Sequence, residues 1–128
     1  KNVKSIILDA RSYKRFTGEA NEPRPGLSSG HIPSSKSLPS SELINKEGYL
    51  KSLDELNSIF SKSEISINDE IIATCGSGVS ACVTAIALFC MGKNDVTIYD
   101  GSWSEWASSG QEIVKGNWIK NLMIKNLT

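Results

Sequence analysis

Residues 71–81 constrain the fold more than any other part of the chain, because three local patterns follow one another there. Residues 71–74, Ile-Ile-Ala-Thr, are apolar and mostly β-branched, which predicts a buried strand. Residues 81–91 are apolar on nearly all sides, which predicts a buried helix. The turn Cys-Gly-Ser-Gly-Val-Ser joins them. A strand, a turn and a helix in this order are typical of an α/β sheet with parallel strands.

Cys75 lies where the predicted strand ends and the turn begins. Two glycines let the turn curl so that backbone N–H groups point toward one centre, and the helix adds the positive end of its dipole. Thiols at helix N-termini have pKa values of about 3.5 to 7.5, against about 8.5 for a free thiol, and the thiolate is the reactive form. Cys75 is therefore predicted to be a nucleophile.

The other cysteines, Cys82 and Cys90, fall within the apolar helix and are expected to be small buried hydrophobic residues. Three cysteines without a Cys-x-x-Cys pair indicate neither a disulfide framework nor a zinc site, so no metal or other cofactor is expected. Lys+Arg and Asp+Glu both number 14, which gives no reason to expect nucleic acid or an anionic membrane as a partner. No segment approaches the ~18 apolar residues of a transmembrane helix.

Strand and helix signals alternate along the 128 residues, as expected for one α/β domain. Strands are predicted at 3–10, 34–39, 70–74 and 96–99, and helices at 12–16, 40–45, 52–62, 81–91 and from 102. Ser52 and Glu55 form a capping-box pattern at the start of one helix. In such sheets ligands bind at the carboxyl ends of the strands, where Cys75 is placed.

The segment from residue 17 to residue 30 is rich in Gly, Pro and Ser and is long for a connection, which is typical of a functional loop. Arg11 and Arg15 precede it. Arg24 lies inside it between two prolines that restrict where its guanidinium reaches. The planar guanidinium, with its paired N–H donors, suits a carboxylate or a sulfur oxyanion. His31 is the only histidine, and a structural hydrogen bond is expected of it rather than catalysis or metal binding.

These motifs together resemble the rhodanese sulfurtransferases, and within that family the catalytic C-terminal domain of its 3-mercaptopyruvate-using members. The likeness covers about residues 3–107. It rests on Asp9-Ala10-Arg11, Arg15-Phe16-x-Gly18, Glu22-Pro23-Arg24, Gly30-His31-Ile32-Pro33, the loop at 75–81, and the run Tyr-Asp-Gly-Ser-Trp-x-Glu-Trp at 99–106. The resemblance implies a rhodanese-like three-layer α/β domain, with a central, mostly parallel sheet and helices on both faces.

The resemblance also implies a reaction. Cys75 takes the sulfur of 3-mercaptopyruvate as a persulfide, pyruvate is released, and the sulfur passes to a thiol, cyanide or a protein acceptor. Arg15 and Arg24 match the pair that holds the substrate carboxylate and carbonyl oxygen, and Ser77 matches a serine that assists proton transfer. Backbone N–H groups over the loop would stabilise the anionic sulfur; its residues are Gly76, Ser77, Gly78, Val79 and Ser80.

Some matching positions imply structure or specificity. Asp9 and Arg11 match positions that look structural, and Ser34 stands where the family usually has glycine, which leaves the local turn geometry open. Thiosulfate-preferring members carry basic side chains just after the cysteine, so the neutral Gly76 and Ser77 favour 3-mercaptopyruvate.

Members of this type are usually tandem proteins. The chain is therefore expected to be one rhodanese domain, with a core at about 3–107 and a tail at 108–128, and to form the C-terminal half beside an N-terminal rhodanese domain. The apolar residues of the tail are expected to dock on the domain or on a partner. A reducing compartment, cytoplasmic or mitochondrial, is expected.

Three alternatives stay open. A persulfide relay domain that feeds a sulfur-carrier protein for tRNA thiolation also needs Cys75, and so does a thiosulfate sulfurtransferase. A cysteine phosphatase uses a similar loop but needs an arginine six residues after the nucleophile, where this chain has Ala81. An inactive module would lack the loop cysteine.

Overall fold

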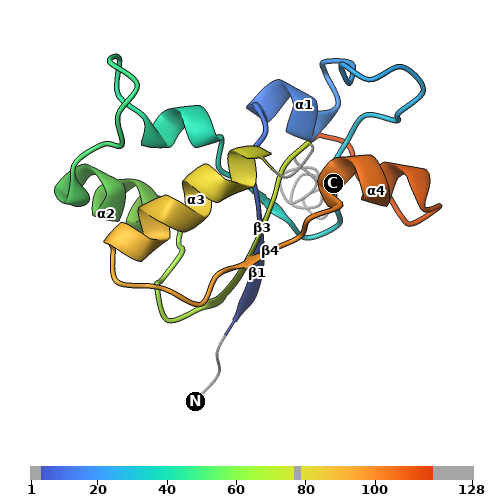
Figure 1. The fold of residues 1–128 in the computed structure, drawn as a ribbon. Coiled ribbons are helices and arrows are strands. Elements are labelled where there is room, and N and C mark those ends of the chain that lie inside the picture. The colour runs from blue at the N-terminus through green and yellow to red at the C-terminus, as the bar shows by residue number, and fades with distance from the viewer. Residues whose placement is uncertain (1–3, 77–78, 117–128) are drawn as a thin grey trace, which may run out of the picture.

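The computed structural model describes residues 4–76 and 79–116. Its centre is a parallel sheet in the order β2-β1-β3-β4 (Figure 1). The two inner strands, β1 (Ser5–Asp9) and β3 (Glu70–Thr74), pair along their whole length. The outer strands, β2 (Lys36–Ser37) and β4 (Thr97–Ile98), are two residues long. Both are shorter than predicted.

The turn before β2 explains part of this difference. Ser34 has a φ of 64°, in the left-handed region, and Ser35 donates from its backbone N–H and its Oγ to Ile32 O. These bonds close a turn, so the extended pairing begins only at Lys36. The serine therefore adopts a backbone conformation that glycine enters more easily.

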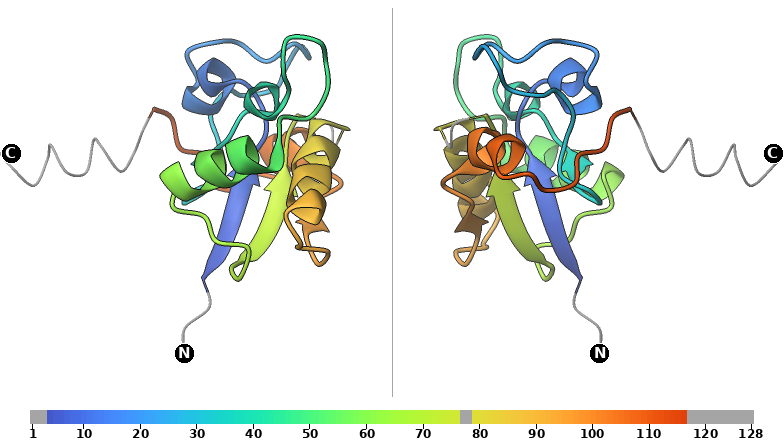
Figure 2. Two further views of the ribbon diagram at one scale, coloured as in Figure 1. Left: turned by 90° about the vertical axis from the view of Figure 1, so that its left-hand side faces the viewer. Right: turned by 90° about the vertical axis from the view of Figure 1, so that its right-hand side faces the viewer.

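Helices cover both faces of the sheet, which confirms the predicted three-layer architecture (Figures 1 and 2). One face carries α2 (Leu53–Lys62) and α3 (Val79–Cys90), with a 3-10 turn, η1 (Ser40–Leu43), beside α3. The other face carries α4 (Ser102–Ser108). The short α1 (Tyr13–Thr17) lies beyond the carboxyl ends of the strands.

The main core lies between the sheet and the α2–α3 face. It is built from apolar side chains of the inner strands and of the two helices, with Phe60, Leu56, Ile71 and Leu88 among the most deeply buried. The predicted capping box opens α2, because the Ser52 and Glu55 side chains each bond the other residue's backbone N–H. This cap satisfies N–H groups that a helix start otherwise leaves unpaired.

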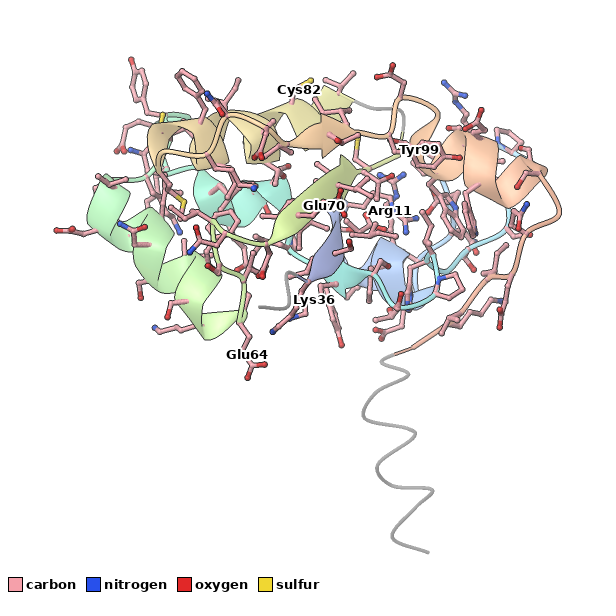
Figure 3. The ribbon with its side chains drawn as sticks, turned by 90° about the horizontal axis from the view of Figure 1, so that it is seen from below. Arg11, Lys36, Glu64, Glu70, Cys82 and Tyr99 are labelled. Carbon is pink, nitrogen blue, oxygen red and sulfur yellow. The ribbon has the colours of Figure 1, made fainter. Side chains whose placement is uncertain are left out.

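The prediction that α3 is buried all round is wrong. Ala81, Thr84, Ala87 and Leu88 face the protein, whereas Val79, Ile86 and Phe89 are 74%, 54% and 67% exposed. Cys82 and Cys90 are also exposed, which contradicts their predicted burial; Figure 3 shows Cys82 on the outer side of α3. The described elements pack against one side of α3 only, and a uniformly apolar run carries no periodicity that could identify that side.

Residues after α4 return to the domain. Val114 forms an antiparallel bridge with His31, and the Gly116 N–H donates to Thr17 O at 2.7 Å. The approach is close, because a Cβ at Gly30 would lie 2.7 Å from Val114 O. The rest of the tail, whose docking was predicted, lies outside the described residues.

Among residues 4–76 and 79–116, no helix has the length and apolar character needed to cross a membrane.

Candidate active site

A cavity of about 410 Å³ opens at the carboxyl ends of the strands. Its walls come from the residues that follow β1, from α1 and the loop after it, from η1, from the loop between β3 and α3, and from the first turns of α3 and α4. The predicted site residues among them are Arg15, Arg24, Cys75, Gly76 and Ser80.

Cys75 follows β3 directly and is 1% exposed, so its sulfur lies at the base of this cavity. The Ala81 N–H, in the first turn of α3, donates to Cys75 Sγ at 3.3 Å. An N–H at a helix N-terminus favours negative charge on the atom it faces. The position where a phosphatase would carry its arginine thus supplies a backbone N–H to the sulfur.

The first turn of α4 fixes the backbone on either side of the nucleophile. The Cys75 N–H donates to Ser102 Oγ at 3.1 Å, and the Trp103 N–H donates to Cys75 O at 2.8 Å. Ser104 donates to Gly76 O from its backbone N–H at 3.1 Å and from its Oγ at 2.8 Å. Both carbonyl oxygens at the start of the loop are therefore bonded to α4, which holds the nucleophile in one orientation.

Gly76 is needed for space. A Cβ at this position would lie 2.6 Å from Arg15 Nη2, closer than real Cβ atoms approach such a group. Its φ does not lie in the left-handed region.

Arg15 projects from α1 into the cavity, with its side chain 27% exposed. It donates to the Glu22 carboxylate from Nε at 3.2 Å and from Nη2 at 2.8 Å. The hydrogen bond to Glu22 raises the pKa of Arg15, and negative charge on Cys75 acts in the same direction. Arg15 is thus a fixed cation next to the nucleophile.

Arg24 reaches the same cavity from the loop after α1. It is exposed, and its Nη1 lies 3.5 Å from Ser104 Oγ, at the limit of a hydrogen bond. Arg24 therefore has more freedom to meet an incoming anion than Arg15 has.

A buried ion pair borders the cavity, and its arginine, Arg11, is one of the lining residues. Arg11 binds Asp9 through Nε and Nη2, and it also donates to Gly30 O at 2.7 Å. Its guanidinium carbon lies 4.6 Å from the ring centroid of Trp103, a cation–π contact. Both side chains of the pair are almost fully buried, in keeping with the structural role predicted for them.

His31 forms the structural hydrogen bond that was predicted. It is fully buried, its Nδ1–H donates to Phe16 O at 2.7 Å, and its ring stacks on the Phe16 ring at a centroid distance of 3.7 Å. Burial lowers the pKa of His31, so the neutral imidazole is favoured.

Not every predicted site residue lines the cavity. Val79 is largely exposed outside it, and Ser77 and Gly78 lie outside the described residues. Glu22 and Ser104 were missed as site residues, although Glu22 belongs to a motif quoted above and Ser104 occupies the unspecified position of the run at 99–106. The signal available for Glu22 was an acidic residue between two arginines in a loop expected to be functional.

The fold and the cavity define a class: an α/β domain with a cysteine nucleophile at a helix N-terminus beside arginine cations. The rhodanese-like domain model matches residues 1–109, and the chain belongs to that family.

Named relatives narrow the comparison. The chain is 48% identical over 102 residues to a 3-mercaptopyruvate sulfurtransferase of Escherichia coli, covering 80% of this chain and 36% of that protein. It is 48% identical over 101 residues to the mitochondrial thiosulfate/3-mercaptopyruvate sulfurtransferase 1 of Arabidopsis thaliana, covering 79% of this chain and 27% of that protein. The chain thus spans about a third of the length of these relatives.

A solved structure agrees with them. The chain is similar to a sulfur transferase subunit of yeast mitochondrial complex I, with a TM-score of 0.81 and 41% identity over 89% of this chain and 39% of that chain. The likeness therefore holds for nearly the whole described domain.

Proposed function

We propose that the domain is a sulfurtransferase that takes sulfur from 3-mercaptopyruvate. The observation that carries the proposal is the position of Cys75 Sγ, which lies at the base of the cavity, accepts a helix N-terminal N–H and has the Arg15 cation beside it. Relatives named for this reaction support the proposal.

The Cys75 thiolate attacks the sulfur of the donor. The S–S bond forms as the C–S bond breaks, and the electron pair of that bond stays on carbon as the enolate of pyruvate. One proton then gives pyruvate, and we assign its delivery to Ser77, as the family resemblance implies. In the second step an acceptor thiolate or cyanide attacks the outer sulfur and regenerates the Cys75 thiolate.

The two arginines suit the two oxygen-bearing groups of the donor, the carbonyl and the carboxylate. In 3-mercaptopyruvate the carbonyl lies between the sulfur-bearing carbon and the carboxylate. Arg15 lies beside Gly76, next to the nucleophile, so we assign the carbonyl oxygen to it. Arg24 reaches the cavity with an exposed side chain, so we assign the carboxylate to it. Backbone N–H groups of Gly76, Gly78, Val79 and Ser80 would stabilise the anionic sulfur.

Thiosulfate is the second candidate donor, because the name of the Arabidopsis relative includes it. The neutral Gly76 favours the keto acid, because the family resemblance implies that thiosulfate-preferring members carry basic side chains just after the cysteine. Transfer to a protein acceptor, including a sulfur carrier for tRNA thiolation, remains a proposal about the second step. We also propose that an N-terminal rhodanese domain precedes this one in a tandem protein, and that the compartment is cytoplasmic or mitochondrial.

Intact-mass spectrometry before and after incubation with 3-mercaptopyruvate tests the proposal. We expect a gain of one sulfur atom that is lost on reduction, absent in Cys75→Ser and retained in the matched control Cys82→Ser, whose side chain is exposed. A parallel arm with thiosulfate distinguishes the donors. The proposal fails if the wild-type chain gains no sulfur from 3-mercaptopyruvate, both alone and joined to an N-terminal rhodanese domain of the kind proposed.

A further inference from the structure

Glu22 is a buried carboxylate in the wall of the cavity that holds Cys75. Its side chain is 2% exposed and contacts two guanidinium groups. Its Oε1 accepts from Arg15 Nη2 at 2.8 Å, and its Oε2 accepts from Arg15 Nε and from Arg11 Nη1, each at 3.2 Å. A buried charge of this kind is tolerated only when it is paired, and here both oxygens are paired.

These contacts fix which part of Arg15 meets the cavity. Glu22 binds the edge of the guanidinium that carries Nε and one hydrogen of Nη2. The Nη1 group and the second Nη2 hydrogen remain on the opposite side, and Nη2 is the atom that a Cβ at Gly76 would meet. Arg15 is thus held by one edge and presents its other donors beside Cys75.

The charges of this region balance. The carboxylates of Asp9 and Glu22 are linked in one network with the guanidinium groups of Arg11 and Arg15. The network therefore adds no net charge to the cavity wall. It orients the Arg15 guanidinium, because hydrogen bonds to a charged donor depend on geometry. Without the Glu22 charge, Arg11 and Arg15 would repel each other across the vacated position.

On the basis of the proposed function, we propose that Glu22 is a positioning residue that holds Arg15 toward the carbonyl oxygen of the keto-acid donor. Negative charge develops on that oxygen as the C–S bond breaks, so a preoriented Arg15 acts mainly in the transition state. Loss of Glu22 should therefore lower the limiting rate of persulfide formation more than it weakens donor binding. Arg24, assigned to the carboxylate, should show the opposite pattern.

The test is single-turnover formation of the Cys75 persulfide over a range of 3-mercaptopyruvate concentrations. Glu22→Gln keeps the side-chain length and removes the charge. We expect its limiting rate to fall at least tenfold while the half-saturating concentration changes less than threefold. The matched control is Glu19→Gln in the same loop, whose carboxylate accepts from Thr17 Oγ1, and it should behave like the wild type.

A double substitution separates positioning from general damage to the fold. Glu22→Gln placed in an Arg15→Gln background should change the rate less than twofold, because the residue through which Glu22 acts is already gone. The rate at which neutral iodoacetamide alkylates Cys75 should differ less than twofold between Glu22→Gln and the wild type. Glu22→Asp keeps the charge and should recover part of the limiting rate. If Glu22→Gln does not fold, Glu22→Asp is compared with the wild type in its place.

The outcomes are distinguishable. A wild-type chain that gains no sulfur, both alone and joined to an N-terminal rhodanese domain, contradicts the proposed function, and the positioning role with it. A wild-type chain that gains sulfur, beside a Glu22→Gln chain with an unchanged limiting rate, contradicts only the positioning role. Additive losses from Glu22→Gln and Arg15→Gln contradict it as well, since they would show that Glu22 acts independently of Arg15.

Discussion

At the scale of single residues, the surroundings of Cys75 are specified by contacts that leave little freedom. Its sulfur accepts the Ala81 N–H, and its own N–H and carbonyl are bonded to the first turn of α4. At the next residue, Gly76, a Cβ would lie 2.6 Å from Arg15 Nη2, so a side chain there requires Arg15 to move. The position of Arg15 beside the nucleophile thus depends on residue 76 being a glycine, which has no Cβ.

Gly76→Ala tests that dependence. The added Cβ must displace Arg15, so we expect the efficiency of persulfide formation from 3-mercaptopyruvate to fall by about tenfold or more, which corresponds to about 1.4 kcal/mol or more of transition-state stabilisation. Single-turnover kinetics give the loss, and a thermal unfolding scan checks that the fold is kept. Wild-type kinetics in the alanine variant would show that the close approach does not matter.

His31 predicts a pH dependence of stability. Burial lowers its pKa in the folded protein, whereas in the unfolded chain it takes up a proton as the pH falls through about 6.5. Asp9 and Arg11 also face the imidazole, and they favour and oppose its protonation respectively. Stability is therefore retained above pH 6.5 and decreases below it.

We expect the thermal unfolding midpoint to decrease between pH 7.5 and pH 5.5, and to decrease less in His31→Asn, whose Nδ2–H can still donate to Phe16 O. Differential scanning calorimetry in matched buffers measures both slopes. Equal slopes for the two proteins would assign the pH dependence to other groups.

At the scale of elements, the site forms where β3, α3 and α4 meet. Ser102 has a φ of 50°, an uncommon conformation for a non-glycine residue. Its Oγ accepts from the Cys75 N–H and donates to Tyr99 O at 2.7 Å, so one buried hydroxyl links the end of β4 to the nucleophile. The unusual backbone thus coincides with a structural link to the site.

Ser102→Ala leaves the buried Cys75 N–H without its acceptor. An unsatisfied buried donor costs about 1 to 3 kcal/mol of unfolding free energy. The matched control is Ser108→Ala at the exposed end of α4, which should change stability by less than about 0.5 kcal/mol. Urea denaturation measures both, and equal changes in the two variants would contradict the link through Ser102.

The elements that could be predicted from sequence are those with strong local signals. β3, the capping box of α2 and the turn at Cys75 follow from short patterns that depend on a few adjacent residues. The exposed face of α3 could not be predicted, because nothing local identifies which side of an apolar helix meets the sheet. The burial of Glu22 could not be predicted either, since it depends on guanidinium groups 7 and 11 residues away.

At the scale of the whole molecule, the domain extends past α4. The Val114 N–H and carbonyl both bond the His31 backbone, and the Gly116 N–H bonds Thr17 O. These contacts connect the residues after α4 to the loop that carries Arg24. The described domain therefore continues to residue 116.

A pair of truncations tests this extent. A chain ending at residue 109 loses three backbone hydrogen bonds that a chain ending at 116 keeps. At about 0.5 to 1.5 kcal/mol for each bond, we expect the shorter chain to be less stable by about 1.5 to 4.5 kcal/mol. Guanidinium denaturation of the two chains gives the difference, and coincident curves would show that residues 110–116 add nothing to the fold.

The pairing of β1 with β3 also has a consequence for synthesis. Residues 5–9 lie against residues 70–74, so most of the central ladder joins segments about 65 positions apart. Such a ladder has high contact order and forms slowly, and it cannot begin while a growing chain is still short. Because Cys75 also needs Ser102, Trp103 and Ser104, its surroundings are complete only after nearly the whole domain has left the ribosome. In a nascent or partly folded chain, the Cys75 thiol therefore lacks the surrounding contacts that prepare it for reaction.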